Sequence, residues 1–170
     1  MACTPVSLDH VNIYVRNAAR SHRWYTDVLG LHTQDTFTFP GTDRVRAVFL
    51  ACSPEHAHDI ALFDVGDDAP GPQKGQVGLN HFAWRMASLD DLAEMYHRLK
   101  AKDVPFTVSD HKVSIGIYFD DPDGNGLEVY YELPRSQWNR QTPFSGEGGK
   151  GRFPGPWDEM LRQVPAGARA

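Results

Sequence analysis

The pattern of apolar and polar positions along the chain occurs twice. Residues 8–15 alternate apolar and polar side chains, as expected of a half-buried strand, and residues 79–86 do the same, with a histidine 71 positions after the first. A helical spacing of apolar residues follows each strand, over residues 18–29 up to Gly30 and from Ser88 onward. Each helix is followed by three strand-like stretches, at residues 33–39, 44–51 and 59–65 in the first half and 106–109, 114–119 and 127–132 in the second.

Each half therefore predicts a β-α-β-β-β module. A single module would leave one face of its sheet uncovered, whereas two modules can close a curved sheet around a shared cavity with the helices outside. We predict an α+β fold in which two βαβββ modules pair into one incomplete mixed β-barrel. The predicted domain covers residues 5–133, with module one at 6–65, a Gly- and Pro-rich linker at 66–77 and module two at 78–133.

The last segment, residues 134–170, differs from the modules because it is rich in Pro and Gly. It is either a poorly ordered tail or an extension whose aromatic residues pack over the barrel mouth or against a second subunit. Large aromatic residues are unusual in a free tail, so we favour packing, and we expect the protein to be a homo-oligomer. The aromatic residues concerned are Trp138, Phe144, Phe153 and Trp157.

Strand alternation predicts which side chains face the shared cavity. The apolar positions of the first strand lie on the face opposite His10, and those of the matching strand lie opposite His81. Because the apolar faces are expected to pack on the helices, both histidines should point inward. In the last strand Glu128 lies opposite Leu127 and Val129, so its carboxylate can join them. The sequence thus predicts a metal site where three potential ligands converge inside the barrel.

Two imidazoles and one carboxylate are the ligands of a facial triad, the usual site of non-haem Fe(II) oxygenases. No nearby cysteine offers a softer ligand, and the zinc-hydrolase helix motif and the Ca²⁺-binding loop are missing. The alternative is that His10 and His81 are ordinary strand histidines bonded to the backbone and that Glu128 is solvated. Their joint occurrence at matched places in a repeat favours the metal site.

Three further polar residues accompany this candidate site. His58 stands 48 residues after His10, on a strand nearly equivalent to that of Glu128. His111 and Tyr118 lie on consecutive segments of the hairpin that leads to Glu128. One histidine can shuttle a proton near neutral pH, and a second histidine with a tyrosine can hydrogen-bond an anionic substrate oxygen. The alternative is that His58 is a structural strand-start histidine and Tyr118 a core aromatic.

The final hairpin carries a recognisable motif. It reads His111, five residues, Ile117-Tyr118-Phe119-Asp120-Asp121-Pro122-Asp123-Gly124, three residues and Glu128. This stretch closely resembles the signature of type I extradiol ring-cleavage dioxygenases, in the vicinal oxygen chelate (glyoxalase, bleomycin resistance and dioxygenase) superfamily. Residues 8–11, 57–63 and 78–84 resemble the family segments that carry the first metal histidine, the catalytic histidine and the second metal histidine. Two differences are Ser109, where the signature has Gly, Asn, Thr or an aliphatic residue, and a single pair of modules where many members have two.

The resemblance implies a metal-ligand set and a catalytic set. The implied ligands of Fe(II), or less often Mn(II), are His10, His81 and Glu128. The implied catalytic residues are His58 as acid/base catalyst and His111 and Tyr118 as contacts of the substrate oxygen. The implied reaction is cleavage of the ring of a catecholic substrate by O₂, beside its two hydroxyl groups.

Two other functions are open. A glyoxalase-type isomerase or epimerase of the same fold needs inward carboxylate or amide ligands from both halves, and this chain has His58 where a first-half Glu would be expected. A metal-free, drug-sequestering binding protein of the same superfamily would lack the ligand set. Metal analysis of the purified protein separates these classes.

Composition and charge exclude some classes of partner and indicate where the protein is located. With 22 acidic residues against 17 Lys and Arg, the 170-residue chain has a formal net charge of −5, which argues against nucleic acid or an anionic membrane as partner. The longest apolar run, residues 47–52, is far shorter than the ~20 residues of a membrane span, and the first residues lack the features of a signal peptide. Cys3 and Cys52 make neither a disulfide framework nor a zinc ribbon, so we expect a cytoplasmic protein.

Overall fold

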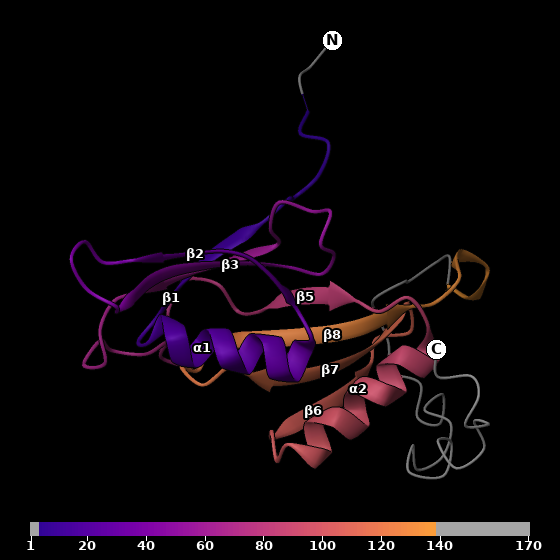
Figure 1. Cartoon of the computed structure of the whole chain (residues 1–170). Helices are drawn as coiled ribbons and strands as arrows, with labels where there is room; N and C mark the ends of the chain where they lie inside the picture. The colour runs from indigo at the N-terminus through magenta and orange to yellow at the C-terminus, as the bar shows by residue number, and fades with distance from the viewer. Residues whose placement is uncertain (1–3, 139–170) are drawn as a thin grey trace. The chain divides into compact units, whose positions relative to one another are not determined.

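The computed structural model describes residues 4–138 of the chain (Figure 1). The fold is α+β and divides between Lys74 and Gly75, inside the predicted linker, into two compact units. Each unit contains one βαβββ module, as the sequence predicts, and forms its own four-stranded mixed sheet rather than part of one closed sheet. The pairing of the modules into an incomplete barrel stays a prediction. No helix among residues 4–138 is long and apolar enough to cross a membrane.

Unit one, the part of the chain before Gly75, has the strand order β1-β4-β3-β2. β1 and β4 are parallel neighbours, whereas β3 is antiparallel to both β4 and β2. The helix α1 follows β1 in the chain and contacts β3 and β4. The elements are β1 Val11–Val15, α1 Ala18–Trp24, a π-helical turn Tyr25–Leu29, β2 His32–Thr38, β3 Val45–Ala51 and β4 Ile60–Asp64.

The helix of unit one begins and ends where the sequence predicts. Asn17 caps its first turn, because its side-chain oxygen accepts a hydrogen bond of 3.0 Å from the Arg20 amide. After Trp24 the helix widens into the π form, and it stops at Gly30, whose φ of 75° lies in the left-handed region that favours glycine. The spacing of apolar residues predicted the length of this helix but not the π turn.

Unit two, from Gly75 onward, has the equivalent strand order β5-β8-β7-β6, with β5 and β8 parallel and the other pairs antiparallel. The side chain of Ser88 caps the helix α2 by accepting a hydrogen bond of 3.1 Å from the Asp91 amide, so the helix begins where the sequence predicts. The elements are β5 Phe82–Arg85, α2 Leu89–Ala101, β6 Phe106–Asp110, β7 Ser114–Asp120, β8 Gly126–Glu132 and a 3₁₀ turn Arg135–Gln137.

Each sheet buries its apolar face, as the strand alternation predicts. Ile13 and Val15 of β1 are buried in unit one, where α1 contacts the same sheet. In unit two Leu127 and Val129 of β8 are buried, together with Leu99 of α2, the helix that contacts β8. Burying a Leu or Val side chain completely stabilises a fold by about 1.5–3 kcal/mol, so these faces fix which side of each sheet is left for polar residues.

Of the predicted C-terminal extension, the structure describes residues up to Trp138. The Trp138 indole N–H donates a hydrogen bond of 2.7 Å to the Leu133 carbonyl, and the Arg135 guanidinium lies 4.3 Å from the centre of the indole ring. Trp138 therefore packs against the chain that follows β8. The other aromatic residues of the extension lie outside the described residues, namely Phe144, Phe153 and Trp157.

The strand registers align the two modules position by position. The first residue pair of β1 and β4 is equivalent to the first pair of β5 and β8, because a predicted metal histidine stands directly before β1 and directly before β5. Counting from these pairs, the module-one counterpart of Glu128 is Ala61. Phe49 is likewise the counterpart of Tyr118. The sequence predicts His58 at the module-one position equivalent to Glu128. His58 instead lies before β4, so this expectation is wrong.

Candidate functional site

A buried carboxylate is the central group of the candidate site in unit two. Glu128 lies in β8, and its register partner on β7 is Tyr118, whose hydroxyl donates a hydrogen bond of 2.7 Å to Glu128 Oε1. Burial raises the pKa of Tyr118, and the hydrogen bond to Glu128 and the charge of that carboxylate raise it further. The phenol therefore stays protonated at neutral pH and remains a donor.

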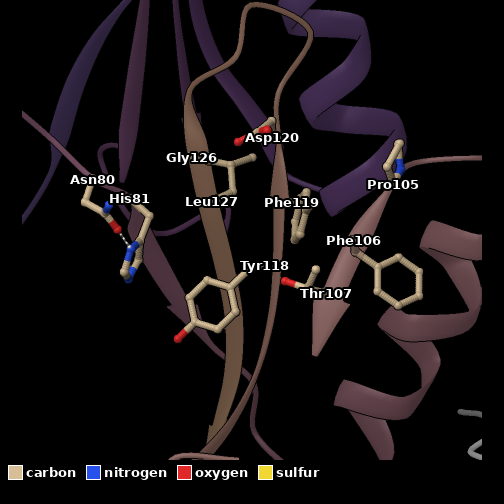
Figure 2. A pocket seen from close by; sticks show the side chains of 10 residues that line it. All are labelled: Asn80, His81, Pro105, Phe106, Thr107, Tyr118, Phe119, Asp120, Gly126 and Leu127. Carbon is tan, nitrogen blue, oxygen red and sulfur yellow. Dashed lines mark hydrogen bonds between the residues drawn. The ribbon is translucent and has the colours of Figure 1, made fainter. Parts of the chain in front are cut away.

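His81 approaches the second oxygen of this carboxylate. Its Nε2 is 3.2 Å from Glu128 Oε2, and its ring meets the Tyr118 ring edge-on with 5.3 Å between the centroids. The other ring nitrogen, Nδ1, is 2.6 Å from the side-chain oxygen of Asn80, the hydrogen bond drawn in Figure 2. The short segment before β5 thus brings an imidazole against Glu128.

His111 extends this set of hydrogen bonds beyond the end of β6. Its Nε2 is 2.7 Å from the Tyr118 hydroxyl oxygen, and the two rings meet edge-on at 5.8 Å. Because the Tyr118 hydroxyl donates its hydrogen bond to Glu128, the Tyr118 oxygen accepts the N–H of His111. The structure therefore joins the predicted site residues of unit two into one connected group, His81, Glu128, Tyr118 and His111.

A cavity of about 410 Å³ adjoins this group (Figure 2). Its wall includes His81 and Tyr118, together with Phe106 and Thr107 of β6 and Asp120 at the end of β7. The volume lies in the range of small-molecule sites, and the lining combines aromatic carbon with a few polar groups. Unit two therefore offers space for a small ligand beside the imidazole and the phenol.

Two strand glycines make room for these side chains, and the sequence reasoning missed both. A Cβ on Gly116 of β7 would overlap Glu128 Oε1 and would lie 3.2 Å from a carbon of the Tyr118 ring. A Cβ on Gly126, at the start of β8, would overlap the carbonyl oxygen of Asn80. Glycine inside a strand often marks such a close approach, which is the signal that could have identified them.

In unit one the predicted residues His10 and His58 lie side by side. Their ring centroids are 4.3 Å apart with the planes at 37°, and Phe49 meets the His58 ring edge-on at 5.2 Å. Burial lowers the pKa of His58, and the neighbouring His10 lowers it further, so His58 is neutral at pH 7. A neutral imidazole in this position can accept a proton.

Two aspartates near this pair, which the sequence reasoning also missed, contact a third histidine. His56 Nε2 is 3.5 Å from Asp9 Oδ1, and His56 Nδ1 is 3.1 Å from Asp59 Oδ1. Asp9 in turn lies 3.7 Å from Nδ1 of His10. The hydrogen bond to Asp59 raises the pKa of His56. The visible signal in the sequence was Asp9 itself, because it directly precedes a candidate metal ligand.

The donor set of unit two fits a divalent metal ion. An imidazole Nε2 and a carboxylate Oε2 approach each other, while Asn80 occupies the remaining ring nitrogen as the outer partner of a metal-bound histidine does. Residues 4–138 hold no group of three His, Cys, Asp or Glu side chains arranged to bind a metal ion. The predicted facial triad of His10, His81 and Glu128 stays a prediction.

Curated relatives match most of the described chain. Biphenyl-2,3-diol 1,2-dioxygenase 3 of Rhodococcus globerulus is 34% identical over 131 residues, which is 76% of this chain and 64% of that protein. Catechol-2,3-dioxygenase of Bacillus subtilis strain 168 is 29% identical over 136 residues, which is 78% of this chain and 44% of that protein. The chain thus spans less than two thirds of the length of either relative.

Solved structures and a family model agree on the fold. A glyoxylase/bleomycin resistance protein/dioxygenase domain from Frankia sp. EAN1pec superposes with a TM-score of 0.62 at 23% identity, covering 76% of this chain and all of that one. Lactoylglutathione lyase from Agrobacterium tumefaciens superposes with a TM-score of 0.55 at 25% identity, covering 75% of this chain and 94% of that one. The family model matches residues 7–129, so the chain belongs to the glyoxalase/bleomycin resistance protein/dioxygenase superfamily.

Proposed function

We propose that this protein is a non-haem Fe(II)-dependent extradiol dioxygenase that cleaves the ring of a catecholic substrate with O₂. The observation that carries the proposal is the connected group around Glu128, in which one oxygen takes the Tyr118 hydroxyl and the other faces His81 Nε2. The relatives named as catechol and biphenyl-diol dioxygenases support the same reaction.

The proposed metal ligands are His10, His81 and Glu128, with Mn(II) as the alternative to Fe(II). When bound, the ion would supply a Lewis acid with open positions for the diol oxygens and O₂. The role of this chain is to present a lone pair from each imidazole and to hold the carboxylate in a fixed orientation. The Tyr118 hydrogen bond serves the second task, since it restrains one oxygen of Glu128.

His58 is the proposed acid/base residue. Because its pKa is lowered by burial and by the neighbouring His10, it is unprotonated at neutral pH and can accept a proton from a substrate hydroxyl. The same nitrogen can return that proton later in the reaction. Phe49, which lies edge-on to His58, limits the movement of the imidazole.

Tyr118 and His111 are the proposed contacts of a substrate oxygen. They are hydrogen-bonded to each other at 2.7 Å, so they form a pair of polar groups with restricted positions. Tyr118 also lines the 410 Å³ cavity, where the aromatic ring of a small diol can be accommodated. The cytoplasmic location and the homo-oligomeric state stay predictions.

The register of the sheets bears on the isomerase alternative. That reading requires an inward carboxylate or amide from module one, at the place equivalent to Glu128. The residue there is Ala61, which is fully buried and has no ligand atom. The asymmetry between the modules therefore favours a triad with one carboxylate.

The decisive test is turnover by anaerobically purified, Fe(II)-loaded full-length protein with catechol and biphenyl-2,3-diol. We expect about one iron per chain, O₂ consumption and a yellow ring-opened product, and we expect loss of both iron and activity in His10→Ala, His81→Ala and Glu128→Ala. His32→Ala is the matched control, because His32 is an exposed histidine at the start of β2. Full iron occupancy in His81→Ala would overturn the ligand assignment, and isomerase activity without O₂ uptake would overturn the reaction.

A further inference from the structure

We propose that Asn80 is a positioning residue that orients His81 for metal binding; Asp9 stands at the equivalent place before His10. The inference rests on the proposed metal site. Each residue stands directly before its histidine, and the two histidines stand directly before the equivalent strands β1 and β5. The internal repeat thus places a side-chain oxygen next to each candidate ligand.

The geometry at His81 specifies which nitrogen can bind a metal. Asn80 Oδ1 is 2.6 Å from His81 Nδ1, and an amide oxygen only accepts hydrogen bonds. When Nδ1 carries the proton and donates it to Asn80, the lone pair of the neutral ring is on Nε2. That is the nitrogen 3.2 Å from Glu128 Oε2. The hydrogen bond therefore selects the tautomer in which two metal-binding atoms face each other.

The position of Asn80 is itself restricted by the start of β8. Its carbonyl oxygen lies so close to Gly126 that a Cβ at residue 126 would overlap it. The backbone of residue 80 therefore packs directly against the strand that carries Glu128. Because the backbone is held there, the Asn80 side chain reaches the imidazole from a defined direction rather than from a free loop.

Module one repeats the arrangement in a looser form. Asp9 Oδ2 is 3.7 Å from His10 Nδ1, and its other oxygen is 3.5 Å from Nε2 of His56. Both distances are longer than an ordinary hydrogen bond, whereas Asn80 is 2.6 Å from His81. We therefore expect a smaller effect from replacing Asp9 than from replacing Asn80.

The test measures Zn(II) affinity of the full-length protein by competition with a chelator, so it needs no turnover. Removing the outer partner of a metal-bound histidine typically weakens binding about 10–100-fold, and we expect this for Asn80→Ala. We expect Asn80→Asp to bind within a few-fold of wild type, because a carboxylate accepts the same hydrogen bond. Gln76→Ala is the control, since Gln76 is an exposed amide of the same unit.

A second measurement separates positioning from folding. In ¹⁵N-labelled, Zn(II)-loaded wild type, we expect a slowly exchanging Nδ1–H resonance from His81, retained in Asn80→Asp and lost in Asn80→Ala, while the metal-free melting temperature changes little. Wild-type Zn(II) affinity in Asn80→Ala, or weaker binding by Asn80→Asp than by Asn80→Ala, would overturn the inference. If Asn80→Ala does not fold, zinc bound through Nδ1 in the wild type would also overturn it. If the wild type binds Zn(II) as expected but its Fe(II) form does not cleave catechols, the proposed function is wrong and the inference about Asn80 still holds.

Discussion

Replacing Gly116 by alanine tests how tightly the Glu128 carboxylate is built into unit two. Gly116 is buried in β7, and its φ lies outside the left-handed region, so alanine fits its backbone. The added Cβ would overlap Glu128 Oε1 and lie 3.2 Å from both Glu128 Cδ and a carbon of the Tyr118 ring. Because the backbone is not strained, the methyl group must displace the carboxylate, the ring or both.

Three contributions determine the size of the effect on the metal-free protein. Alanine inside a strand is favoured over glycine by about 0.5–1 kcal/mol. An extra methyl group in a packed interior costs about 1–3 kcal/mol, and a displaced carboxylate weakens the hydrogen bond from Tyr118, which is worth about 1.5–3 kcal/mol. The terms overlap because they involve the same atoms, so we expect the free energy of unfolding to fall by about 2–4 kcal/mol.

The metal affinity should respond more strongly than folding. A shifted Glu128 no longer presents Oε2 to the cation in register with His81, so we expect Zn(II) or Fe(II) binding to weaken at least about 10-fold. Urea unfolding of the metal-free protein and chelator competition measure the two effects separately. Gly78→Ala is the matched control, because a Cβ there would meet nothing within 4 Å. Wild-type metal affinity in Gly116→Ala would refute the reasoning, since the carboxylate could then move without consequence.

Three further changes probe other parts of the site. Tyr118→Phe removes the hydrogen bond to Glu128, so we expect urea unfolding to show a loss of about 1.5–3 kcal/mol, with iron retained on elemental analysis. His58→Gln should keep iron and catechol binding while turnover falls about 10²–10⁴-fold. The lowered pKa of His58 should also place the acidic limb of the wild-type rate profile below pH 6.5, with that limb missing in His58→Gln. Cys52 is exposed, but partial desolvation of its thiol and the neighbouring Asp59 raise its pKa to about 11. Peptide mapping after iodoacetamide treatment at pH 8 should therefore find it far less alkylated than a free thiol, and Asp59→Asn should increase its alkylation.

The elements of both modules could be predicted because each depends on a local pattern. Alternating polarity identified the strands, and the caps at Ser88 and Gly30 fixed where α2 begins and where the helix of unit one ends. The same alternation predicted that Glu128 and His81 lie opposite the buried apolar residues, and the structure brings these two side chains together. The relation of His10 to that pair depends on the arrangement of two units, which no local pattern specifies.

The parts of the site that escaped prediction depend on contacts between distant residues. Asn80 became significant only through its distance to His81, and Gly126 only through its closeness to the Asn80 backbone. The sequence can mark a strand glycine as a point of close approach, or a residue as the neighbour of a candidate ligand, but it does not say which atoms they contact. For His58 the sequence suggested a position that the structure does not confirm. Its spacing from His10 placed it at the module-one equivalent of Glu128, but the strand register shows that Ala61 occupies that position.

The internal repeat contains a natural comparison for the Gly116→Ala experiment. Counting along the antiparallel registers, the module-one counterpart of Gly116 is Ala47, just as the counterpart of Glu128 is Ala61. A methyl group at position 47 is buried without conflict because position 61 has no long side chain to displace. The module with a glutamate at this place has glycine near it on the adjacent strand, whereas the module with alanine has alanine there.

If Gly116 is needed to leave space for the carboxylate, the double variant Gly116→Ala/Glu128→Ala should be more stable than the sum of the two single changes indicates. We expect a coupling of about 1–3 kcal/mol in urea unfolding. Additive changes would mean that Gly116 serves some other purpose in β7.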